Sequence, residues 1–215
     1  MLITIANVLD QKTLDQVTDL ISTFRWKDGA ETAGKTAREV KRNFQADLSS
    51  RTGAAISDHP VLKAAAQPAR FSKLLVSKTE LGGGYGLHVD NAMMPVGDDK
   101  IRTDLSFTLF LAKPSDYEGG ELQIEYAGLS LRLKPNAGDL VLYQSTSLHQ
   151  VQDVTAGTRL ACIGWIESRI KRAEDREIVF DLANLKSELA KHYPTQSPEM
   201  LISAKLLANL IRRFS

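Results

Sequence analysis

Cysteine is almost absent from this chain of 215 residues, which contains only Cys162. One cysteine cannot form an internal disulfide, and Cys162 lies in an apolar run where a small core side chain is expected. Scarce cysteine is typical of proteins in a reducing compartment. We therefore expect a cytoplasmic protein with Cys162 in its core.

The chain also lacks an excess of charge of either sign, and it has no long apolar run. The 27 basic and 26 acidic residues give a formal net charge of +1, which provides no electrostatic reason to expect nucleic acid or a membrane as partner. No apolar run approaches the roughly 20 residues that span a bilayer. Residues 1–5 lack the basic start and the long apolar core of a signal peptide.

The spacing of apolar residues predicts three parts, namely a mostly helical support region at 1–70, a β-rich core at 71–168 and a helical region at 169–215. In the first part we expect a strand at 2–5, a helix capped by Asp10 and a helix with Pro60 in its first turn. The segments 26–29 and 32–34 are expected to be turns. The polar segment 41–45 is expected to be solvated loop or helix surface.

Strict alternation marks the strands of the middle part. In the segment 103–111 the residues Leu105, Phe107 and Leu109 share one face, and the opposite face, with Asp104, Ser106 and Thr108, would line a polar pocket. Short strands separated by glycine turns predict a β-sandwich or barrel. We expect an α+β, mainly β protein, with a jelly-roll core (a double-stranded β-helix) and flanking N-terminal and C-terminal helices.

Helical spacing returns in the last part of the chain. Ile178, Leu182, Leu185 and Leu189 form one stripe, and Ser197-Pro198-Glu199 predicts the start of a final helix. The final helix carries a broad apolar stripe. Such a stripe either docks on the core or pairs with another subunit, and the sequence leaves both alternatives open.

The segment around His88 carries the chemistry. A glycine run at 82–84 and Pro95 bracket an extended stretch in which His88 and Asp90 point to the same side. An imidazole and a carboxylate side by side are two thirds of the 2-His-1-carboxylate set that holds non-haem iron(II). His149, at the end of another β-like run, is the third candidate ligand. Arg159 follows ten residues later, as a cation for a dicarboxylate that chelates the metal.

Together these segments resemble the iron(II)- and 2-oxoglutarate-dependent dioxygenases, in particular their prolyl-4-hydroxylase-like branch and the bacterial PKHD-type hydroxylases. The matching segments are 86–91, 119–122, 135–143 and 149–159, with Trp165 and the N-terminal segment 26–34. The resemblance implies that His88, Asp90 and His149 bind Fe(II). It also implies that Arg159 binds the distal carboxylate of 2-oxoglutarate, because a guanidinium forms two parallel hydrogen bonds to a carboxylate.

The activity that the resemblance implies is hydroxylation by O2 with release of succinate and CO2, with L-ascorbate keeping the iron reduced. Peptidyl proline, a free amino acid and a small metabolite all remain open as substrates. The alternative function is a metal- and 2-oxoglutarate-binding sensor without turnover. A hydrolase built on Ser145, Ser147 and His149 is disfavoured because the sequence has no nucleophile elbow.

Individual residues have simpler interpretations beside these. His88 and Asp90 could be a surface pair, and His149 a hydrogen-bonded core histidine. Arg159 could pair with Asp153, in which case Arg102 or Lys113 would be the next candidates for the carboxylate. Tyr85 could wall the 2-oxoglutarate pocket or fill the core. His59 and His192 have no partner at ligand spacing.

A lid is the last expectation from the sequence. The segment 91–100 contains Pro95, Gly97 and several aspartates, which favours a loop over a strand. It follows Asp90 directly and carries Met93 and Met94, adaptable apolar side chains suited to closing over a substrate.

Overall fold

The protein is described by a computed structural model that covers residues 1–32, 38–48 and 50–215. Positions 33 and 34 of the predicted turn at 32–34 lie outside the described residues. The helices are α1 (Gln11–Ser22), α3 (Ser50–Asp58), α4 (Pro60–Ala66), α5 (Ala173–Leu189) and α6 (Pro198–Phe214), with 3-10 turns η1 (Gly29–Thr32) and η2 (Pro114–Asp116).

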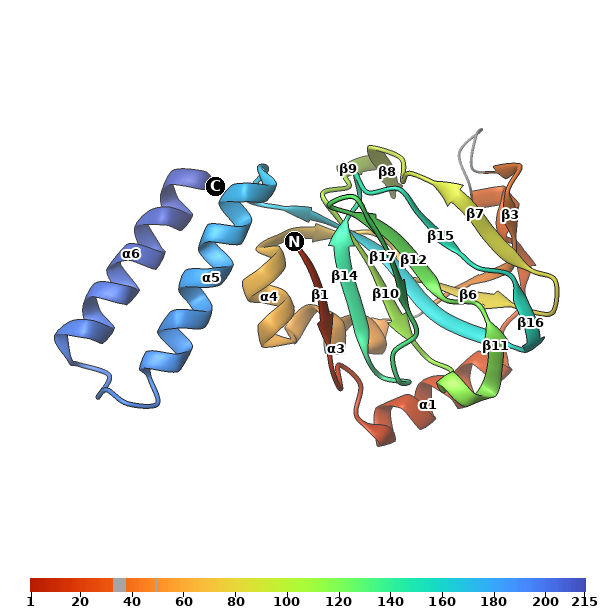
Figure 1. Cartoon of the computed structure of the whole chain (residues 1–215), viewed down its shortest axis with the longest axis horizontal. Helices are drawn as coiled ribbons and strands as arrows, with labels where there is room; N and C mark the ends of the chain where they lie inside the picture. Colours follow the sequence, from red (N-terminus) through yellow and green to blue (C-terminus); the bar gives the residue numbers. More distant parts are fainter. Residues whose placement is uncertain (33–37, 49) are drawn as a thin grey trace.

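Two antiparallel sheets form the core (Figure 1). The larger has the order β1 (Leu2–Ile5), β14 (Leu140–Gln144), β10 (Leu105–Phe110), β17 (Arg159–Ser168), β6 (Leu75–Thr79), β4 (Phe44–Asp47) and β2 (Lys27–Asp28), and β5 (Pro68–Phe71) also pairs with β17. The smaller has the order β13 (Leu129–Leu133), β12 (Leu122–Tyr126), β15 (His149–Val151), β7 (Gly84–His88) and β3 (Lys41–Arg42). Two further pairs join β11 (Tyr117–Gly119) to β16 (Val154–Gly157) and β8 (Met93–Val96) to β9 (Asp99–Arg102). The jelly-roll core is thus confirmed.

Strand β10 separates the two apolar layers of the molecule. Leu105, Phe107 and Leu109 belong to the core cluster that includes Leu14 of α1 and Leu62 of α4. The opposite face of the larger sheet meets the smaller sheet in a second cluster, in which Phe110, Val141 and Tyr143 pack against Leu122 and Ile124. Alternation along one strand therefore supplies both layers, as the spacing predicts.

Helix α1 begins as predicted. Asp10 accepts a hydrogen bond from the backbone N–H of Thr13 at 2.8 Å, which satisfies one of the free amides at the helix N-terminus. Leu14, Val17 and Ile21 then turn one buried face toward the larger sheet. Helix α4 also begins at Pro60, as predicted. Helix α3 was not predicted.

Two predictions about the N-terminal region are wrong. Lys27 and Asp28 are a strand paired with Gln45 and Phe44, where a turn was expected. The segment 41–45 supplies strands to both sheets, where solvated loop or helix surface was expected. Its pattern of burial has period two, with Lys41, Asn43 and Gln45 buried. These strands were not predicted because the side chains on their buried face are polar, whereas a strand is recognised in a sequence by the alternation of apolar and polar residues.

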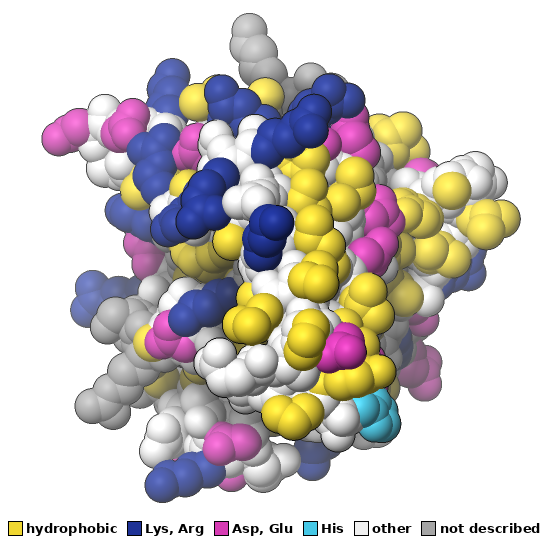
Figure 2. Space-filling model, turned by 90° about the vertical axis from the view of Figure 1, so that its left-hand side faces the viewer, with side chains coloured by type: hydrophobic (Ala, Val, Ile, Leu, Met, Phe, Trp, Pro, Cys, Tyr) yellow, Lys and Arg dark blue, Asp and Glu magenta, His cyan; other side chains and the backbone are white. Residues whose placement is uncertain are grey.

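The C-terminal helices form a pair beside the core (Figure 1). Helix α6 packs on α5 and α5 packs on α4, and the predicted cap of α6 is confirmed by a 3.3 Å hydrogen bond from Met200 N to Ser197 Oγ. The helix predicted from Ile178, Leu182, Leu185 and Leu189 is α5, although Ile178 and Leu185 are 49% and 55% exposed. Hydrophobic side chains gather in a column on this side of the molecule, beside a band of Lys and Arg (Figure 2). Within the described ranges, no helix has the length and apolar character that crossing a membrane requires.

Candidate active site

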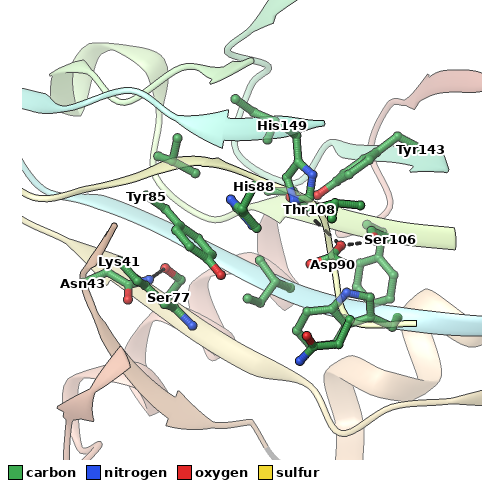
Figure 3. Close-up of a pocket in the computed structure, with 18 of the residues that line it drawn as sticks. Lys41, Asn43, Ser77, Tyr85, His88, Asp90, Ser106, Thr108, Tyr143 and His149 are labelled. Atoms are coloured by element: carbon green, nitrogen blue, oxygen red, sulfur yellow. Dashed lines mark hydrogen bonds and ion pairs between the residues drawn. The ribbon is translucent and has the colours of Figure 1, made fainter. Parts of the chain in front are cut away.

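His88 and His149 lie opposite each other on neighbouring strands. The antiparallel pairing of β7 and β15 makes them partners in register, with ring centroids 4.2 Å apart. Asp90 lies two residues after the end of β7, and its Oδ2 is 3.7 Å from His149 Nε2 (Figure 3). One ligand atom from each of the three residues lies within 4.8 Å of the others. The structure therefore brings all three predicted ligands to one point between the sheets.

Both imidazoles are held in the tautomer that suits metal binding. His88 Nδ1 lies 2.7 Å from the carbonyl oxygen of Gly86, and His149 Nδ1 lies 3.0 Å from that of Ser147. A carbonyl oxygen can only accept, so each Nδ1 carries the proton and each Nε2 keeps a free lone pair. Such a contact fixes the ring of a metal-binding histidine.

The carboxylate is oriented by a short hydroxyl chain. Asp90 Oδ2 accepts a 2.6 Å hydrogen bond from Ser106 Oγ on β10, and Ser106 Oγ is 2.7 Å from Ser145 Oγ. Ser106 and Thr108 face the pocket as predicted, but Asp104 does not. Its carboxylate instead pairs with Arg102 at 2.7 Å. Ser145, proposed in the hydrolase alternative, thus supports Asp90 through Ser106.

Burial keeps His88 uncharged. Removal from water, together with the neighbouring His149, lowers the pKa of His88 to about 4. An imidazole with this pKa is neutral at physiological pH, which is the form that binds a metal. The donor set of two neutral nitrogens and one carboxylate fits iron(II) in the facial arrangement that leaves other positions open.

Arg159 opens β17 inside the same pocket and is 1% exposed. Its Nε donates to the carbonyl oxygen of Gly120 at 2.9 Å, while its buried Nη2 has no hydrogen-bond partner among the described residues. Burial lowers the pKa of this guanidinium. Asp153, the alternative partner, pairs with Arg42 at 2.5 Å. Arg159 thus presents a buried donor that a carboxylate would satisfy.

The other candidates for the carboxylate lie elsewhere. Arg102 pairs with Asp104 through Nε at 2.7 Å and through Nη2 at 2.8 Å. Lys113 lines a separate surface hollow with Gln11 and Asn136. Neither Arg102 nor Lys113 lines the pocket of His88.

Tyr85 forms a wall of the pocket. Its ring stacks on that of His88 with centroids 3.5 Å apart and planes 18° apart. Burial raises the pKa of Tyr85, so the phenol remains protonated. Lys41 Nζ lies 5.1 Å from the centroid of the Tyr85 ring.

Sequence reasoning missed several polar lining residues, namely Lys41, Asn43, Ser77 and Thr79. Figure 3 shows Lys41, Asn43 and Ser77 grouped beside Tyr85, away from His149 and Tyr143. Asn43 Nδ2 donates to Ser77 Oγ at 2.6 Å. The alternation of Lys41, Asn43 and Gln45 was the signal that could have found this group.

The expected lid is a β-hairpin, so its prediction as a loop is wrong. Strands β8 and β9 pair from Met93–Arg102 to Val96–Asp99, and Gly97 takes a φ of 62° in the turn between them. Pro95 is accommodated because β8 is an edge strand. Met94 lines the pocket, whereas Met93 is 49% exposed.

Comparisons with known proteins agree on one family. A sequence profile described as the 2OG-Fe(II) oxygenase superfamily matches residues 74–167. A PKHD-type hydroxylase of Hyphomonas neptunium is 50% identical over 222 residues, which cover 100% of this chain and 99% of that protein.

Solved structures share the fold at lower identity. A Pseudomonas putida prolyl-4-hydroxylase has a TM-score of 0.56 and 21% identity, covering 78% of this chain and 92% of its own. A Trichoplax adhaerens prolyl hydroxylase, in complex with a peptide fragment of hypoxia inducible factor, has a TM-score of 0.57 and 20% identity, covering 80% and 86%.

Proposed function

The chain belongs to the PKHD-type hydroxylases of the 2OG-Fe(II) oxygenase superfamily and is an Fe(II)- and 2-oxoglutarate-dependent dioxygenase; we propose that His88, Asp90 and His149 hold its iron and that Arg159 holds its 2-oxoglutarate. One observation carries the assignment of ligands. The imidazoles of His88 on β7 and His149 on β15 converge with the carboxylate of Asp90, just after β7, and both Nδ1 atoms are directed to backbone carbonyls. Three protein donors on one side leave room for a chelating co-substrate and O2.

The buried Nη2 of Arg159 supports the second assignment. Arg159 is anchored through Nε to Gly120, so its free edge has a fixed direction. A carboxylate that accepts from this edge would satisfy a donor that otherwise remains buried without a partner. Thr108, Tyr143 and Leu122 line the same pocket and are buried. The distal carboxylate of 2-oxoglutarate fits this position.

The reaction divides into what the bound groups supply and what the chain supplies. Iron and 2-oxoglutarate, when bound, supply O2 activation and the transfer of one oxygen atom to a substrate C–H, with release of succinate and CO2. Ser106 orients Asp90, and the carbonyls of Gly86 and Ser147 orient the imidazoles. Tyr85 shields the His88 ring on one face. The chain therefore contributes orientation and exclusion of water, while the redox chemistry belongs to the metal centre.

Formation of succinate from 2-oxoglutarate under air tests the activity. We expect succinate and CO2 in equal amounts when Fe(II) is present, and loss of both in His149→Ala. His192→Ala is the matched control, because His192 lies outside the pocket. Binding of metal and 2-oxoglutarate without any succinate would favour the sensor that the sequence left as the alternative.

We further propose a reductant, a cellular compartment and a substrate class for the reaction. L-Ascorbate would return oxidised iron to Fe(II), as the family resemblance implies. The buried and unpaired Cys162 supports work in the reducing cytoplasm. The substrate would be a small molecule or a peptide. The peptide complex of the Trichoplax adhaerens neighbour supports the second class only by analogy of fold.

The hairpin β8–β9 would act as a lid over the substrate. Strand β9 is anchored, because Ile101 is fully buried and Arg102 pairs with Asp104. Met93 and Met94 lie on β8, and Met94 lines the same pocket as Asp90. We propose that β8 closes over the substrate while β9 stays in place.

Two copies would pair through the exposed side of α5 and α6. Leu185 is 55% exposed, Leu201 50%, Ile202 57% and Leu206 48%. An apolar face of this kind is typical of a protein–protein contact. Ile202→Glu should convert the dimer to a monomer in light scattering, and Leu81→Glu is the control, because Leu81 is 74% exposed and lies outside α5 and α6. A parent protein that is already monomeric would contradict this proposal.

A further inference from the structure

Gly86 connects the metal ligand His88 to the N-terminal part of the chain. Its carbonyl oxygen lies 2.7 Å from His88 Nδ1, and its backbone N–H donates to the carbonyl oxygen of Val40 at 2.8 Å. Val40 lies directly before β3, which pairs with β7. The residue whose carbonyl sets the tautomer of His88 is therefore itself held by the segment that leads into β3.

The ligand strand β7 carries an extra residue at this point. His88 pairs with His149 of β15, and the next pair in the ladder joins Tyr85 to Val151 after a shift of register. Two residues of β7, of which Gly86 is the first, thus stand against one residue of β15, which is the pattern of a β-bulge. Side chains three positions apart in a regular strand point to opposite faces, whereas Tyr85 and His88 both line the pocket and stack with ring centroids 3.5 Å apart (Figure 3). The bulge therefore turns His88 to the pocket side together with Tyr85.

The bulge requires a residue without a side chain. A Cβ atom added to Gly86 would lie 2.8 Å from Val40 Cβ and 3.3 Å from Val40 Cγ1. The shorter separation is well below the roughly 3.5–4.0 Å at which carbon atoms pack. Val40 Cβ is bonded to the backbone, so rotation of the side chain does not remove this clash. Gly86 has no positive φ, so the close approach of Val40 is what requires glycine here.

The neighbouring glycines let β3 lie close along β7. Arg42 of β3 pairs with Gly84 of β7, and a Cβ atom added to Gly83 would lie 2.6 Å from the carbonyl oxygen of Arg42. The Arg42 guanidinium also binds Asp153 at 2.5 Å. The glycines before His88 therefore allow the contact between the two strands, and this contact brings Val40 onto Gly86.

We propose that Val40 and Gly86 are positioning residues for the metal centre, because the contact between them holds the bulge of β7 and directs Nδ1 of His88 to the Gly86 carbonyl. We call this contact the Val40–Gly86 clamp. Neither residue supplies a ligand atom to the triad, and both act through His88. The inference rests on the proposed function, since it concerns how one proposed iron ligand is held.

Anaerobic titration with Fe(II) tests the clamp. Gly86→Ala should weaken Fe(II) binding about 10- to 100-fold, the range typical of groups that orient a metal ligand. Val40→Gly, added to Gly86→Ala, removes the Cβ that meets the new methyl group, so it should restore most of the affinity. Val40→Ala keeps that Cβ and should restore little. Gly53→Ala is the matched control, because its new Cβ would make an ordinary contact with Leu74 Cδ1, at 3.6 Å.

The tautomer of His88 separates positioning from a general loss of structure. Long-range proton–nitrogen NMR spectra of the metal-free protein at neutral pH show which ring nitrogen carries the proton. The parent should carry it on Nδ1 of both His88 and His149. In Gly86→Ala, His88 should show a mixture of tautomers, whereas His149 should be unchanged, because its Nδ1 faces the carbonyl of Ser147. Gly86→Ala/Val40→Gly should return His88 to the Nδ1–H form.

Three results would overturn the clamp. They are Fe(II) binding by Gly86→Ala as tight as by Gly53→Ala, an unchanged tautomer of His88 in Gly86→Ala, and no recovery of affinity in Gly86→Ala/Val40→Gly. If Gly86→Ala does not fold, the double variant carries the test, since it should fold, bind Fe(II) and keep Nδ1–H on His88, and its failure to do so overturns the clamp. A parent that binds no Fe(II) would instead contradict the proposed function, and the tautomers would still decide on the clamp.

Discussion

His88 and His149 are register partners across β7 and β15, and each directs Nδ1 to the carbonyl oxygen of the residue two positions before it. The two histidines therefore share one local geometry, although they come from distant parts of the chain. In both, a backbone carbonyl fixes the ring, that of Gly86 within β7 and that of Ser147 in the turn before β15, so no additional side chain is needed to set the tautomer. The lone pairs of both Nε2 atoms remain available at the same place.

Loss of one ligand should abolish tight metal binding. His149→Ala should weaken Fe(II) binding by more than the roughly 10- to 100-fold that is typical of residues that only orient a ligand. Anaerobic titration with Fe(II) gives the dissociation constant, and circular dichroism checks the fold. His192→Ala should match the parent. Unchanged affinity in His149→Ala would show that the metal lies elsewhere.

Loss of the hydroxyl that orients Asp90 should have a smaller effect. Ser106→Ala removes the 2.6 Å hydrogen bond to Asp90 Oδ2 and should weaken Fe(II) binding about 10- to 100-fold. Ser130→Ala is the control, because Ser130 Oγ donates to the distant Glu125. If Ser106→Ala binds iron as tightly as Ser130→Ala, the hydroxyl chain has no role in positioning the carboxylate.

Replacement of Arg159 should affect the co-substrate more than the metal. Arg159→Ala should weaken 2-oxoglutarate binding roughly 10- to 100-fold, because a charge-assisted hydrogen bond contributes about 1.5–3 kcal/mol. Arg159→Lys should recover part of the loss, since it keeps the charge but lacks the planar fork. Calorimetric titration of the Fe(II)-loaded protein under nitrogen measures the change, with the exposed Arg132→Ala as control. An unchanged 2-oxoglutarate affinity in Arg159→Ala would contradict the assignment.

Lys41 should destabilise the folded protein at neutral pH. Its folded-state pKa of about 8 lies below the ordinary value of 10.5, so folding disfavours the charged amine. The penalty is complete below pH 8 and disappears as the pH rises through 10.5. Lys41→Met should therefore raise the free energy of unfolding at pH 7 by up to about 3 kcal/mol. The gain should shrink toward pH 10.5 in urea unfolding.

The same unfolding series contains its control. Lys78→Met removes a lysine that pairs with Glu80 at the surface, so it should give no comparable gain at pH 7. A Lys41→Met protein that is less stable than the parent at pH 7 would contradict this prediction. It would mean that the contacts of Lys41 stabilise the folded protein by more than the burial of its charge destabilises it.

Limited proteolysis should distinguish two positions of strand β9, Lys100 beside the turn of the hairpin and Arg102 at the anchored end. Trypsin should cleave after Lys100 faster than after Arg102, because Arg102 is held by Asp104 and by the carbonyl oxygen of Ser168. Bound substrate, with Fe(II) and 2-oxoglutarate under nitrogen, should slow cleavage after Lys100 as β8 closes. Equal rates with and without substrate would leave the hairpin as an ordinary exposed connection.

The sequence predicted the parts of the site that depend on local alternation. His88 and Asp90 share a face because they are two residues apart in extended backbone, and Ser106 and Thr108 follow the same rule on β10. The strict alternation in the middle part of the chain likewise predicted strands, and β12 and β13 are two of them. In these cases the alternation of side-chain type along the sequence matches the two faces of the strand.

Some of the strands that the sequence did not predict depend on pairing with distant segments. Strands β3 and β4 are recognisable only when β6 and β7 are beside them, because their buried residues are Lys41, Asn43 and Gln45. Hairpin β8–β9 was missed because Pro95 opposes strand formation unless the strand lies at an edge. The division of the chain into three domains stays a prediction, although segments before residue 71 supply strands to both sheets.

The register that joins His88 to His149 also has a consequence for how the chain folds. The two residues are separated by about 60 positions, so the site exists only after a slow, non-local pairing of strands has formed. A slip of one residue in β15 would turn His149 to the outer face of the sheet. Iron that binds only the correct register would therefore select it from misaligned alternatives during folding. Metal supplied during refolding should therefore favour the correct alignment of the strands, in addition to its role in catalysis.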